Sequence, residues 1–215
     1  MPEGRARYED RRDAGRALAP QVAGLGLVDP LVRALPRGGV PVAAEVAGAL
    51  GCTFGVLVAR KIGAPRSPEL AVGAITEGGE PWLDEALLRR LGLSADDLAE
   101  TVEQERAELA RRVQHYRGDR PLPELFGRQV VLVDDGLATG ATARSALRTL
   151  RRGQPARLVL AVPVCSSPSA QALMSEADDV VCALQPSGFR AVGEWYDRFE
   201  PTSDAEVLSL LRAAG

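Results

Sequence analysis

Two neighbouring carboxylates, Asp134 and Asp135, stand where an apolar run meets a loop rich in glycine and threonine. The loop consists of Gly136, Leu137, Ala138, Thr139, Gly140, Ala141 and Thr142. An ionised carboxylate only accepts hydrogen bonds, so the acid pair suits the hydroxyl groups of a sugar. Glycine backbone N–H groups and threonine hydroxyls suit the oxygens of a phosphate. The pattern predicts a site for a ribose 5-phosphate unit, with its diol on the carboxylates and its phosphate in the loop.

The segments on either side of this loop have to position it. Residues 130–133 are four consecutive aliphatic residues, which is typical of a strand buried on both faces of a parallel sheet. Beyond the loop, apolar residues recur at helical spacing at Ala143, Ala146, Leu147 and Leu150. A helix that begins here turns the positive end of its dipole toward the loop. The alternative is a plain turn, with an exposed acid pair at the end of the strand and no ligand.

A second candidate anion site lies between an expected strand at 31–35 and an expected helix at 40–50. This loop consists of Pro36, Arg37, Gly38 and Gly39. An arginine and two glycines just before a helix N-terminus can bind an anion, because backbone N–H groups and a positive side chain converge there. The alternative is a glycine-rich turn that holds no ligand.

Arg60 and Lys61 follow an apolar run at 54–59, which we predict to be the next parallel strand. Lys61 is the single lysine among the chain's 26 basic residues, which indicates a place where a compact charge matters. A right-handed crossover between parallel strands would bring Lys61 to the same edge of the sheet as Arg37 and Asp134. The alternative is that this lysine survived by chance in an arginine-rich chain.

Apolar runs alternate with helical patterns, which is typical of an open doubly wound α/β sheet of about five parallel strands. The expected strands are 31–35, 54–59, 130–133, 158–164 and 180–184. Residues 62–82 predict a loop and a hairpin that turns at 77–79. Residues 84–116 predict a helical insertion, stabilised by pairs of opposite charge three and four residues apart. We interpret the insertion as a solvated helical hairpin, with a dimer contact as the alternative.

Composition narrows the class of protein. A length of 215 residues suits one domain, and a net charge of −3 with a pI near 5.4 argues against nucleic acid as a partner. No apolar run approaches the roughly 18 residues of a membrane span, and no signal-like segment precedes the charged start, so we expect a cytoplasmic protein without a membrane partner. Cys52, Cys165 and Cys182, with the single histidine His115, give no zinc pattern. We expect these cysteines to be core residues.

Aromatic residues gather in the last part of the chain, at Phe189, Trp195, Tyr196 and Phe199. Flat rings can stack on a planar base, and Trp195 and Phe199 are the candidates for this role. The alternative is an apolar cluster under the final helix.

The segment at 130–142, VVLVDDGLATGAT, resembles the phosphoribosyl-pyrophosphate (PRPP) binding motif of the type I phosphoribosyltransferases. It differs from the Gly-Lys-Ser/Thr and Gly-x-Gly-x-x-Gly loops of other nucleotide-binding folds. The resemblance covers about residues 31–184 and is weak toward both ends. It implies that a nucleophile displaces pyrophosphate at C1 of PRPP. It also implies a Mg²⁺ ion that bridges sugar and pyrophosphate and is held by Asp134 and Asp135, mostly through substrate hydroxyls and water.

The same resemblance implies further roles. It makes residues 36–39 a pyrophosphate loop, with a cis peptide bond between Pro36 and Arg37, and it assigns Arg60 and Lys61 to the neutralisation of pyrophosphate. The expected catalytic residues are Arg37, Lys61, Asp134 and Asp135. Residues 65–69 become a mobile flap that closes over the reaction centre. The chain is expected to be a single domain, 1–215, with a core at 31–184, an insertion at 84–116 and a hood over the acceptor built from 1–28 and 185–215.

The acceptor is less well defined than the donor. In relatives that use 6-oxopurines an aspartate precedes the Thr-Gly of the motif, whereas this chain has Ala138, so that general base is absent. We expect a nucleobase or related nitrogen acceptor. The alternative to an enzyme is a regulatory protein of the same fold that binds PRPP or a nucleotide as a signal. The flap-like segment and Lys61 favour turnover, and a homodimer is compatible with either function.

Overall fold

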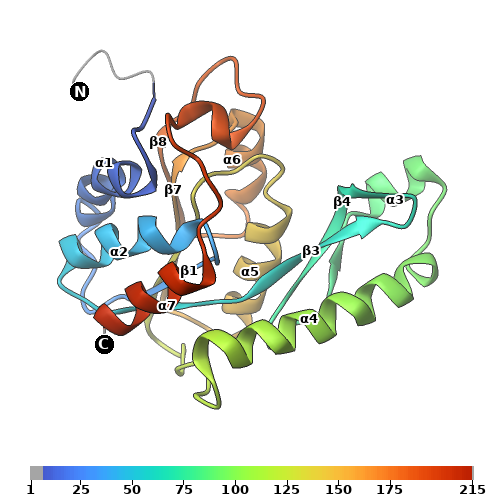
Figure 1. The fold of residues 1–215 in the computed structure, drawn as a ribbon, viewed down its shortest axis with the longest axis horizontal. Helices are drawn as coiled ribbons and strands as arrows, with labels where there is room; N and C mark the ends of the chain where they lie inside the picture. The colour runs from blue at the N-terminus through green and yellow to red at the C-terminus, as the bar shows by residue number, and fades with distance from the viewer. Residues whose placement is uncertain (1–6, 215) are drawn as a thin grey trace.

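The computed structural model describes residues 7–214 and is built around a five-stranded parallel sheet (Figure 1). Its strands are β1 (Leu31–Ala34), β2 (Phe54–Val56), β6 (Gln129–Val133), β7 (Arg157–Val164) and β8 (Asp179–Leu184). Their order across the sheet is β2-β1-β6-β7-β8, and every neighbouring pair is parallel. The chain therefore winds outward in both directions from β1 and β6. This confirms the predicted doubly wound sheet.

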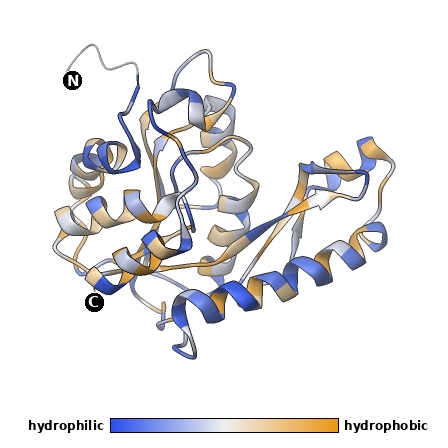
Figure 2. Cartoon of the chain, viewed as in Figure 1, coloured by the Kyte–Doolittle hydropathy of each residue, from blue (hydrophilic) through white to orange (hydrophobic). Residues whose placement is uncertain are grey.

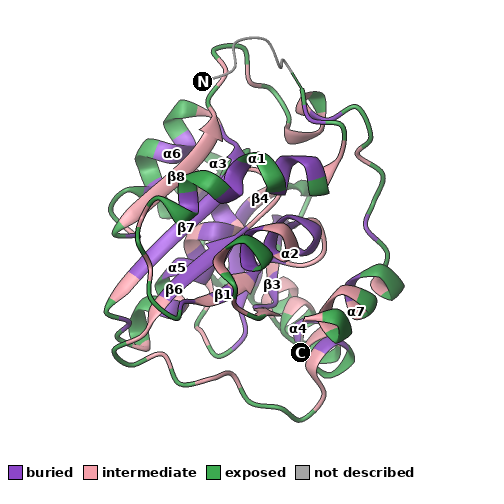
Figure 3. Cartoon of the chain, turned by 90° about the vertical axis from the view of Figure 1, so that its left-hand side faces the viewer, coloured by how far each residue is buried: buried purple, intermediate pink, exposed green. Residues whose placement is uncertain are grey.

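Helices cover both faces of this sheet, as the uninterrupted apolar strands require. One face packs against α1 (Arg11–Ala23) and α2 (Gly39–Leu50), and α7 (Asp204–Ala213) packs on α2. The other face packs against α5 (Ala141–Arg152) and α6 (Ser167–Leu173). Alternate residues of β6 belong to the two cores, so the strand is buried on both sides (Figure 3).

A second, smaller sheet leaves the main body as an arm (Figure 1). Its antiparallel strands are β3 (Ala59–Ala64), β4 (Ser67–Thr76) and β5 (Trp82–Leu83), followed by α3 (Glu85–Leu91), η1 (Asp96–Leu98) and α4 (Ala99–Arg117). We call residues 59–117 the hairpin arm. The α4 helix lies along it, with a largely hydrophilic outer surface (Figure 2). The helical insertion predicted at 84–116 thus packs on the arm as α3, η1 and α4.

The predicted strand at 54–59 is wrong at its end. Strand β2 stops at Val56, and the chain then changes partners. The N–H of Leu57 donates to the carbonyl of Ala34 at 3.0 Å, whereas the carbonyl of Val58 accepts from Glu77 at 3.0 Å. Within 62–82, predicted to be a loop and a hairpin, the first residues instead form the end of β3, a turn and the start of β4. A continuous apolar run does not reveal that its two halves are buried in different sheets.

The base of the arm is fixed by a buried acid. Glu77 is 6% exposed, and its Oε1 accepts from the N–H of Val58 at 2.7 Å and from Nη1 of Arg117 at 3.0 Å. The helical region predicted at 84–116 begins as expected, because Asp84 is the N-cap of α3 and its side chain accepts from the N–H of Leu87 at 3.0 Å.

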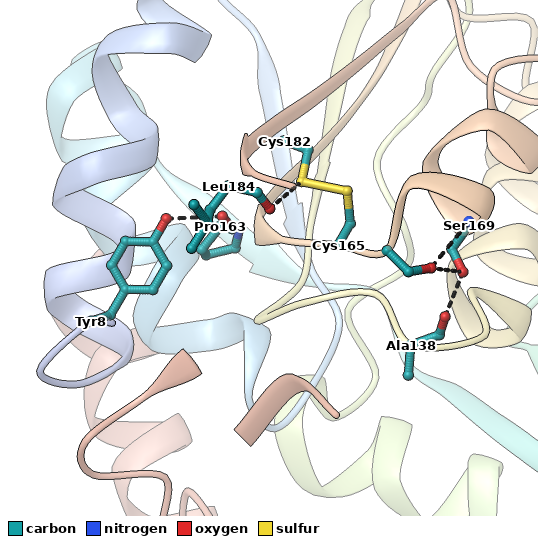
Figure 4. The surroundings of a disulfide bond; sticks show 8 residues. Tyr8, Ala138, Pro163, Cys165, Ser169, Cys182 and Leu184 are labelled. Carbon is teal, nitrogen blue, oxygen red and sulfur yellow. Dashed lines mark hydrogen bonds between the residues drawn. A yellow bond between two sulfur atoms is a disulfide. The ribbon is translucent and has the colours of Figure 1, made fainter. Parts of the chain in front are cut away.

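Two cysteines form a disulfide that was not expected. Cys165 and Cys182 are joined, with their Cα atoms 6.4 Å apart, at the carboxyl ends of β7 and β8 (Figure 4). Cys165 is fully buried in the core and Cys182 packs against it, as predicted, but the bond between them was not predicted. Cys52 has a free thiol and is half-buried, and burial raises its pKa.

The N-terminal part of the predicted hood consists of a helix and a short segment before it, and the two make different contacts. Helix α1 packs on α2 and on the sheet, as a covering helix. Before this helix, Tyr8 pairs with Tyr196 of the C-terminal segment through a β-bridge. The ends of the predicted hood at residues 1–6 and 215 lie outside the described residues.

Candidate functional site

The two predicted anion loops meet at the carboxyl ends of β1 and β6, which are parallel neighbours. A Cβ at Gly39 would lie 2.7 Å from the carbonyl oxygen of Val133, and a Cβ at Gly38 would overlap the carboxylate of Asp135. Glycine is therefore required at both positions for this close approach. We call this meeting place the rim, defined by residues 34–39 and 133–142.

The peptide bond between Pro36 and Arg37 is cis, as predicted. Nη1 of Arg37 lies 3.9 Å from Oδ1 of Asp204 at the start of α7, and the two side chains are 39% and 46% exposed. A pair this long and this exposed contributes little to stability. The guanidinium of Arg37 is thus available to an anion that binds at the rim.

Asp134 and Asp135 are held in a desolvated part of the rim. Burial raises the pKa of both; the charge of Asp135 raises that of Asp134 further, whereas Arg11 opposes the rise on Asp135. Oδ1 of Asp134 accepts from the N–H of Asp135 at 2.9 Å, and Oδ2 of Asp135 accepts from Nε of Arg11 at 2.8 Å. The other oxygen of each carboxylate has no hydrogen-bond partner among residues 7–214. Two acceptor oxygens therefore remain for a ligand.

Arg11 is a residue of the site that the sequence analysis did not assign to it. Its side chain is 11% exposed, its Nη1 donates to the carbonyl of Glu200 at 2.8 Å, and its guanidinium carbon lies 3.9 Å from the centre of the Phe199 ring. Arg11 thus ties the start of α1 to both the rim and the C-terminal segment. Its partner Asp135 is 124 residues away, and the charged run around Arg11 carries no signal of that contact.

The phosphate loop, residues 136–142, is supported from the neighbouring strand and helix. The N–H of Leu137 donates to the carbonyl of Val164 at 2.9 Å, and the hydroxyl of Ser169 donates to the carbonyl of Ala138 (Figure 4). Gly140 has a φ of +73° and, as the N-cap of α5, offers no side-chain cap. An uncapped helix start behind a fixed loop is the geometry expected of an anion site.

The two threonines of this loop lie at the opening of α5. Oγ1 of Thr139 is 3.5 Å from the backbone nitrogen of Ala141, which is a long hydrogen bond, and Thr142 is in the first turn of the helix. A phosphate oxygen would offer both groups a stronger, charge-assisted partner.

Arg60 and Lys61 do not follow a strand of the main sheet, so that part of the prediction is wrong. Both lie on β3. Nε of Arg60 is 2.6 Å from Oε2 of Glu105 on α4, and Nζ of Lys61 is 3.0 Å from Oε2 of Glu69 on β4. The predicted flap, 65–69, is the exposed tip of the same hairpin. The roles of Arg60 and Lys61 toward pyrophosphate stay a prediction.

The predicted stacking residues lie in an apolar cluster beside the rim. Trp195 ends η2 (Val192–Trp195), and its Nε1 is buried without a hydrogen-bond partner in the described part of the chain. The ring of Phe199 has its centre 4.9 Å from that of Tyr196. Tyr196, a second residue missed as a site residue, donates its hydroxyl to the carbonyl of Asp135 at 2.6 Å. The cluster packs on Tyr8 and Ala14 rather than under the final helix, which was the alternative, and stacking on an acceptor stays a prediction.

Two absences concern residues 7–214. Every helix in this range falls short of the length and apolarity needed to cross a bilayer. The same range holds no group of three or more His, Cys, Asp or Glu side chains placed to bind a metal ion.

Comparison with known proteins gives three findings. A family model described as "Phosphoribosyl transferase domain" matches residues 8–197. Two strain versions of a Mycobacterium tuberculosis protein, MT0597 and Rv0571c, are 44% identical over 207 residues, or 96% of this chain, and their names assign them provisionally to the phosphoribosyl transferases. The chain spans 47% of the length of these curated relatives, about half.

The third finding is structural. The protein TT1426 from Thermus thermophilus is similar over 97% of this chain and 99% of its own, with 43% identity and a TM-score of 0.81. A Neisseria gonorrhoeae protein solved with bound ppGpp is 15% identical, with a TM-score of 0.55 over 97% of this chain and 95% of its own. At that identity the second likeness concerns the fold alone.

Proposed function

The chain belongs to the phosphoribosyl transferase domain family, and from this premise we propose that it transfers the 5-phosphoribosyl group of PRPP to a nucleobase or related nitrogen acceptor. One observation carries the proposal. The pyrophosphate loop, the acid pair and the phosphate loop meet at a single rim, where glycines bring their backbones into contact. These three anchors correspond to the three polar portions of PRPP.

The acid pair is assigned to the ribose. Asp134 and Asp135 each keep one carboxylate oxygen without a partner among residues 7–214, and the sugar offers two hydroxyl donors. Each charge-assisted hydrogen bond contributes about 1.5–3 kcal/mol, so the pair is a major source of affinity for the diol. Both carboxyls are desolvated, which strengthens such bonds.

The pyrophosphate is assigned to the other loop. Arg37 has only a weak, exposed partner, and the backbone of Gly38 and Gly39 runs directly into α2. Lys61 shares a hairpin with the predicted flap, so closure of that hairpin would carry its ammonium toward the rim. Closure would also exclude water, which otherwise hydrolyses PRPP.

Magnesium fits this arrangement as an ion brought by the substrate. Mg²⁺ usually keeps several waters and binds substrate phosphates, so Asp134 and Asp135 would hold it mostly through substrate hydroxyls and water. When bound, the ion would neutralise the charge that develops on the departing pyrophosphate.

The chemistry then needs little proton transfer from the protein. The bond from C1 to the pyrophosphate oxygen breaks and a bond from C1 to the acceptor nitrogen forms, through a state in which positive charge develops on the sugar. Ala138 provides no side-chain base, so orientation of the two reactants and the nearby carboxylates would supply most of the rate. Trp195 and Phe199 remain the candidates for contact with the acceptor.

The proposal is tested by measuring pyrophosphate release. The protein is incubated with PRPP, MgCl₂ and one acceptor at a time, chosen from adenine, hypoxanthine, uracil, orotate and simple amines. We expect release with one class of acceptor and none with the variant carrying Asp134→Asn and Asp135→Asn. PRPP binding by calorimetry without release from any acceptor would instead support the regulatory alternative.

A further inference from the structure

A cavity of about 440 Å³ opens beside β2, the edge strand of the main sheet. Its lining includes three arginines, Arg33, Arg117 and Arg120, and no Asp or Glu among the described residues. Neither loop of the rim contributes to it. The cavity is therefore a strongly basic place that the proposed transfer reaction does not use.

Arg33 reaches this cavity from the interior of the sheet. It lies on β1, and its partner on the edge strand is Gly55. A Cβ at Gly55 would lie 2.5 Å from Nη1 of Arg33. The glycine thus leaves the space that the guanidinium occupies above the edge strand. A charged side chain in the middle of a buried strand is costly unless its charge is compensated.

The charge of Arg33 is compensated only in part. Its Nε is buried and has no acceptor among the residues that the structure describes, and its Nη1 donates to the carbonyl of Val32 at 3.1 Å. Glu77, whose charge acts on Arg33, already accepts from both Arg117 and the N–H of Val58. Burial lowers the pKa of Arg33, and the charge of Arg117 lowers it further. An anion in the cavity would offset this repulsion.

The other residues that line the cavity indicate what kind of body the anionic ligand would have. Phe54, Leu122 and Leu211 give the cavity an apolar wall, and its volume lies in the range of small-molecule sites. Arg120 is exposed, and its Nε makes only a long bond of 3.4 Å to the carbonyl of Arg117, so its guanidinium can turn to a ligand.

We propose that this cavity is a second binding site, separate from the rim, for a small molecule that carries a phosphate or carboxylate on an apolar or planar body. The anionic group is held by Arg33 and Arg120. The body packs on Phe54, Leu122 and Leu211.

Nuclear magnetic resonance can read this site directly. In ¹⁵N-labelled protein, the side-chain Nε–H signal of Arg33 is identified by its absence in Arg33→Met, and the backbone N–H of Gly55 reports on the same place. Phenyl phosphate, benzoate and inorganic phosphate are titrated separately. Phenyl phosphate or benzoate should shift both signals saturably, and inorganic phosphate should bind more weakly because it lacks the apolar body. A preference between the first two probes identifies the anionic group.

Three variants test the assignment. Arg120→Met and Gly55→Ala should each weaken the preferred probe about 10-fold or more, the first by removing a charge-assisted bond and the second by displacing the Arg33 guanidinium. Arg90→Met, an exposed arginine on α3, is the matched control and should leave affinity unchanged. If Arg33→Met does not fold, the backbone N–H of Gly55 still reports binding in the parent and in Arg120→Met. The proposal is overturned if no probe shifts the two signals, or if Arg120→Met and Gly55→Ala bind as tightly as the control.

Discussion

The rim and the hairpin arm hold charged groups in opposite ways. At the rim, residues 36–39 and 133–135 touch through backbone atoms that only glycine allows to approach, and the acid pair is desolvated. Toward the tip of the arm, Lys61 and Glu69 form an ion pair whose side chains are 46% and 93% exposed. The geometry of the rim is thus fixed by the sheet, whereas the tip of the arm is held by contacts that water can replace.

This difference separates two tasks within one proposed reaction. Recognition of a phosphorylated sugar needs acceptors and donors at fixed distances, which a packed rim supplies. A segment that closes over the reactants must exchange its contacts at little cost in free energy. Exposed ion pairs suit this, because each contributes at most about 1 kcal/mol to stability. Between them, the Glu77–Arg117 pair joins two segments at the base of the arm, and Glu77 also accepts from the N–H of Val58 just outside it.

The largest effect is expected from the acid pair. Asp134→Asn combined with Asp135→Asn should weaken PRPP binding by about 100-fold to 10,000-fold, because two charge-assisted hydrogen bonds to the sugar lose their charge. Calorimetry with PRPP and MgCl₂ measures the loss. Asp96→Asn, an exposed acid on the arm, is the control and should bind normally. Unchanged affinity in the double variant would remove the diol assignment.

The burial of Asp134 should also make the folded chain less stable at neutral pH than at low pH. Because burial raises the pKa of Asp134 above 3.8, the folded chain keeps this proton to a higher pH than the unfolded chain does. Its contribution to stability is therefore complete at low pH and is lost as the pH rises through the folded pKa. Asp134→Asn should have a higher Tm than the parent at pH 7 and a smaller advantage near pH 4. A lower Tm at pH 7 would contradict this account.

The next largest effect is expected at the base of the arm. Glu77→Gln should lower the free energy of unfolding by about 3 kcal/mol, because it removes the buried charge that partners Arg117, whose side chain is only 16% exposed. Urea denaturation measures the difference. Glu103→Gln, which breaks the exposed pair with Arg106, should cost less than about 1 kcal/mol. Similar losses of unfolding free energy in the two variants would mean that the ion pair at the base of the arm is no stronger than an exposed pair on its surface.

A pair of glycines in one helix gives an intermediate effect. Gly39→Ala should cost about 1–3 kcal/mol, since the new Cβ would lie 2.7 Å from a backbone oxygen at the rim. Gly48→Ala, later in α2 and with open space around it, should gain about 0.5–1 kcal/mol. Thermal unfolding compares them. If both substitutions stabilise, the two loops of the rim are not in close contact.

The smallest effect on stability is expected at the tip. Lys61→Met and Glu69→Gln should each change the free energy of unfolding by less than about 1 kcal/mol, because their ion pair is exposed. Only Lys61→Met should reduce PRPP-dependent turnover, by about 10-fold, through loss of a charge-assisted contact to pyrophosphate. Equal turnover in the two variants would exclude Lys61 from the reaction.

The sequence predicted what is encoded locally. The run from Gln129 through α5 contains its own strand, loop and helix signals, and the structure has all three. The change of partner after Val56 could not be predicted, because both halves of that apolar run are buried and only distant segments decide which sheet each joins. The contact of Arg11 with Asp135 also joins residues far apart in the sequence, so the local sequence does not predict it.

The pairing of the two cysteines also could not be predicted from the local sequence. Cys165 and Cys182 come together because β7 and β8 are neighbours in a register that places Val164 opposite Leu184. Strand order and register follow from the whole fold, so an odd number of widely spaced cysteines gave no signal.

That covalent link has a practical consequence. It closes a segment whose two cysteines are 17 positions apart, and this segment contains Ser169, which holds the carbonyl of Ala138 in the phosphate loop. Material purified with a thiol reagent and material purified without one would therefore differ in the support beneath the loop. Rates or affinities collected on the two preparations would describe two chemical forms of the protein.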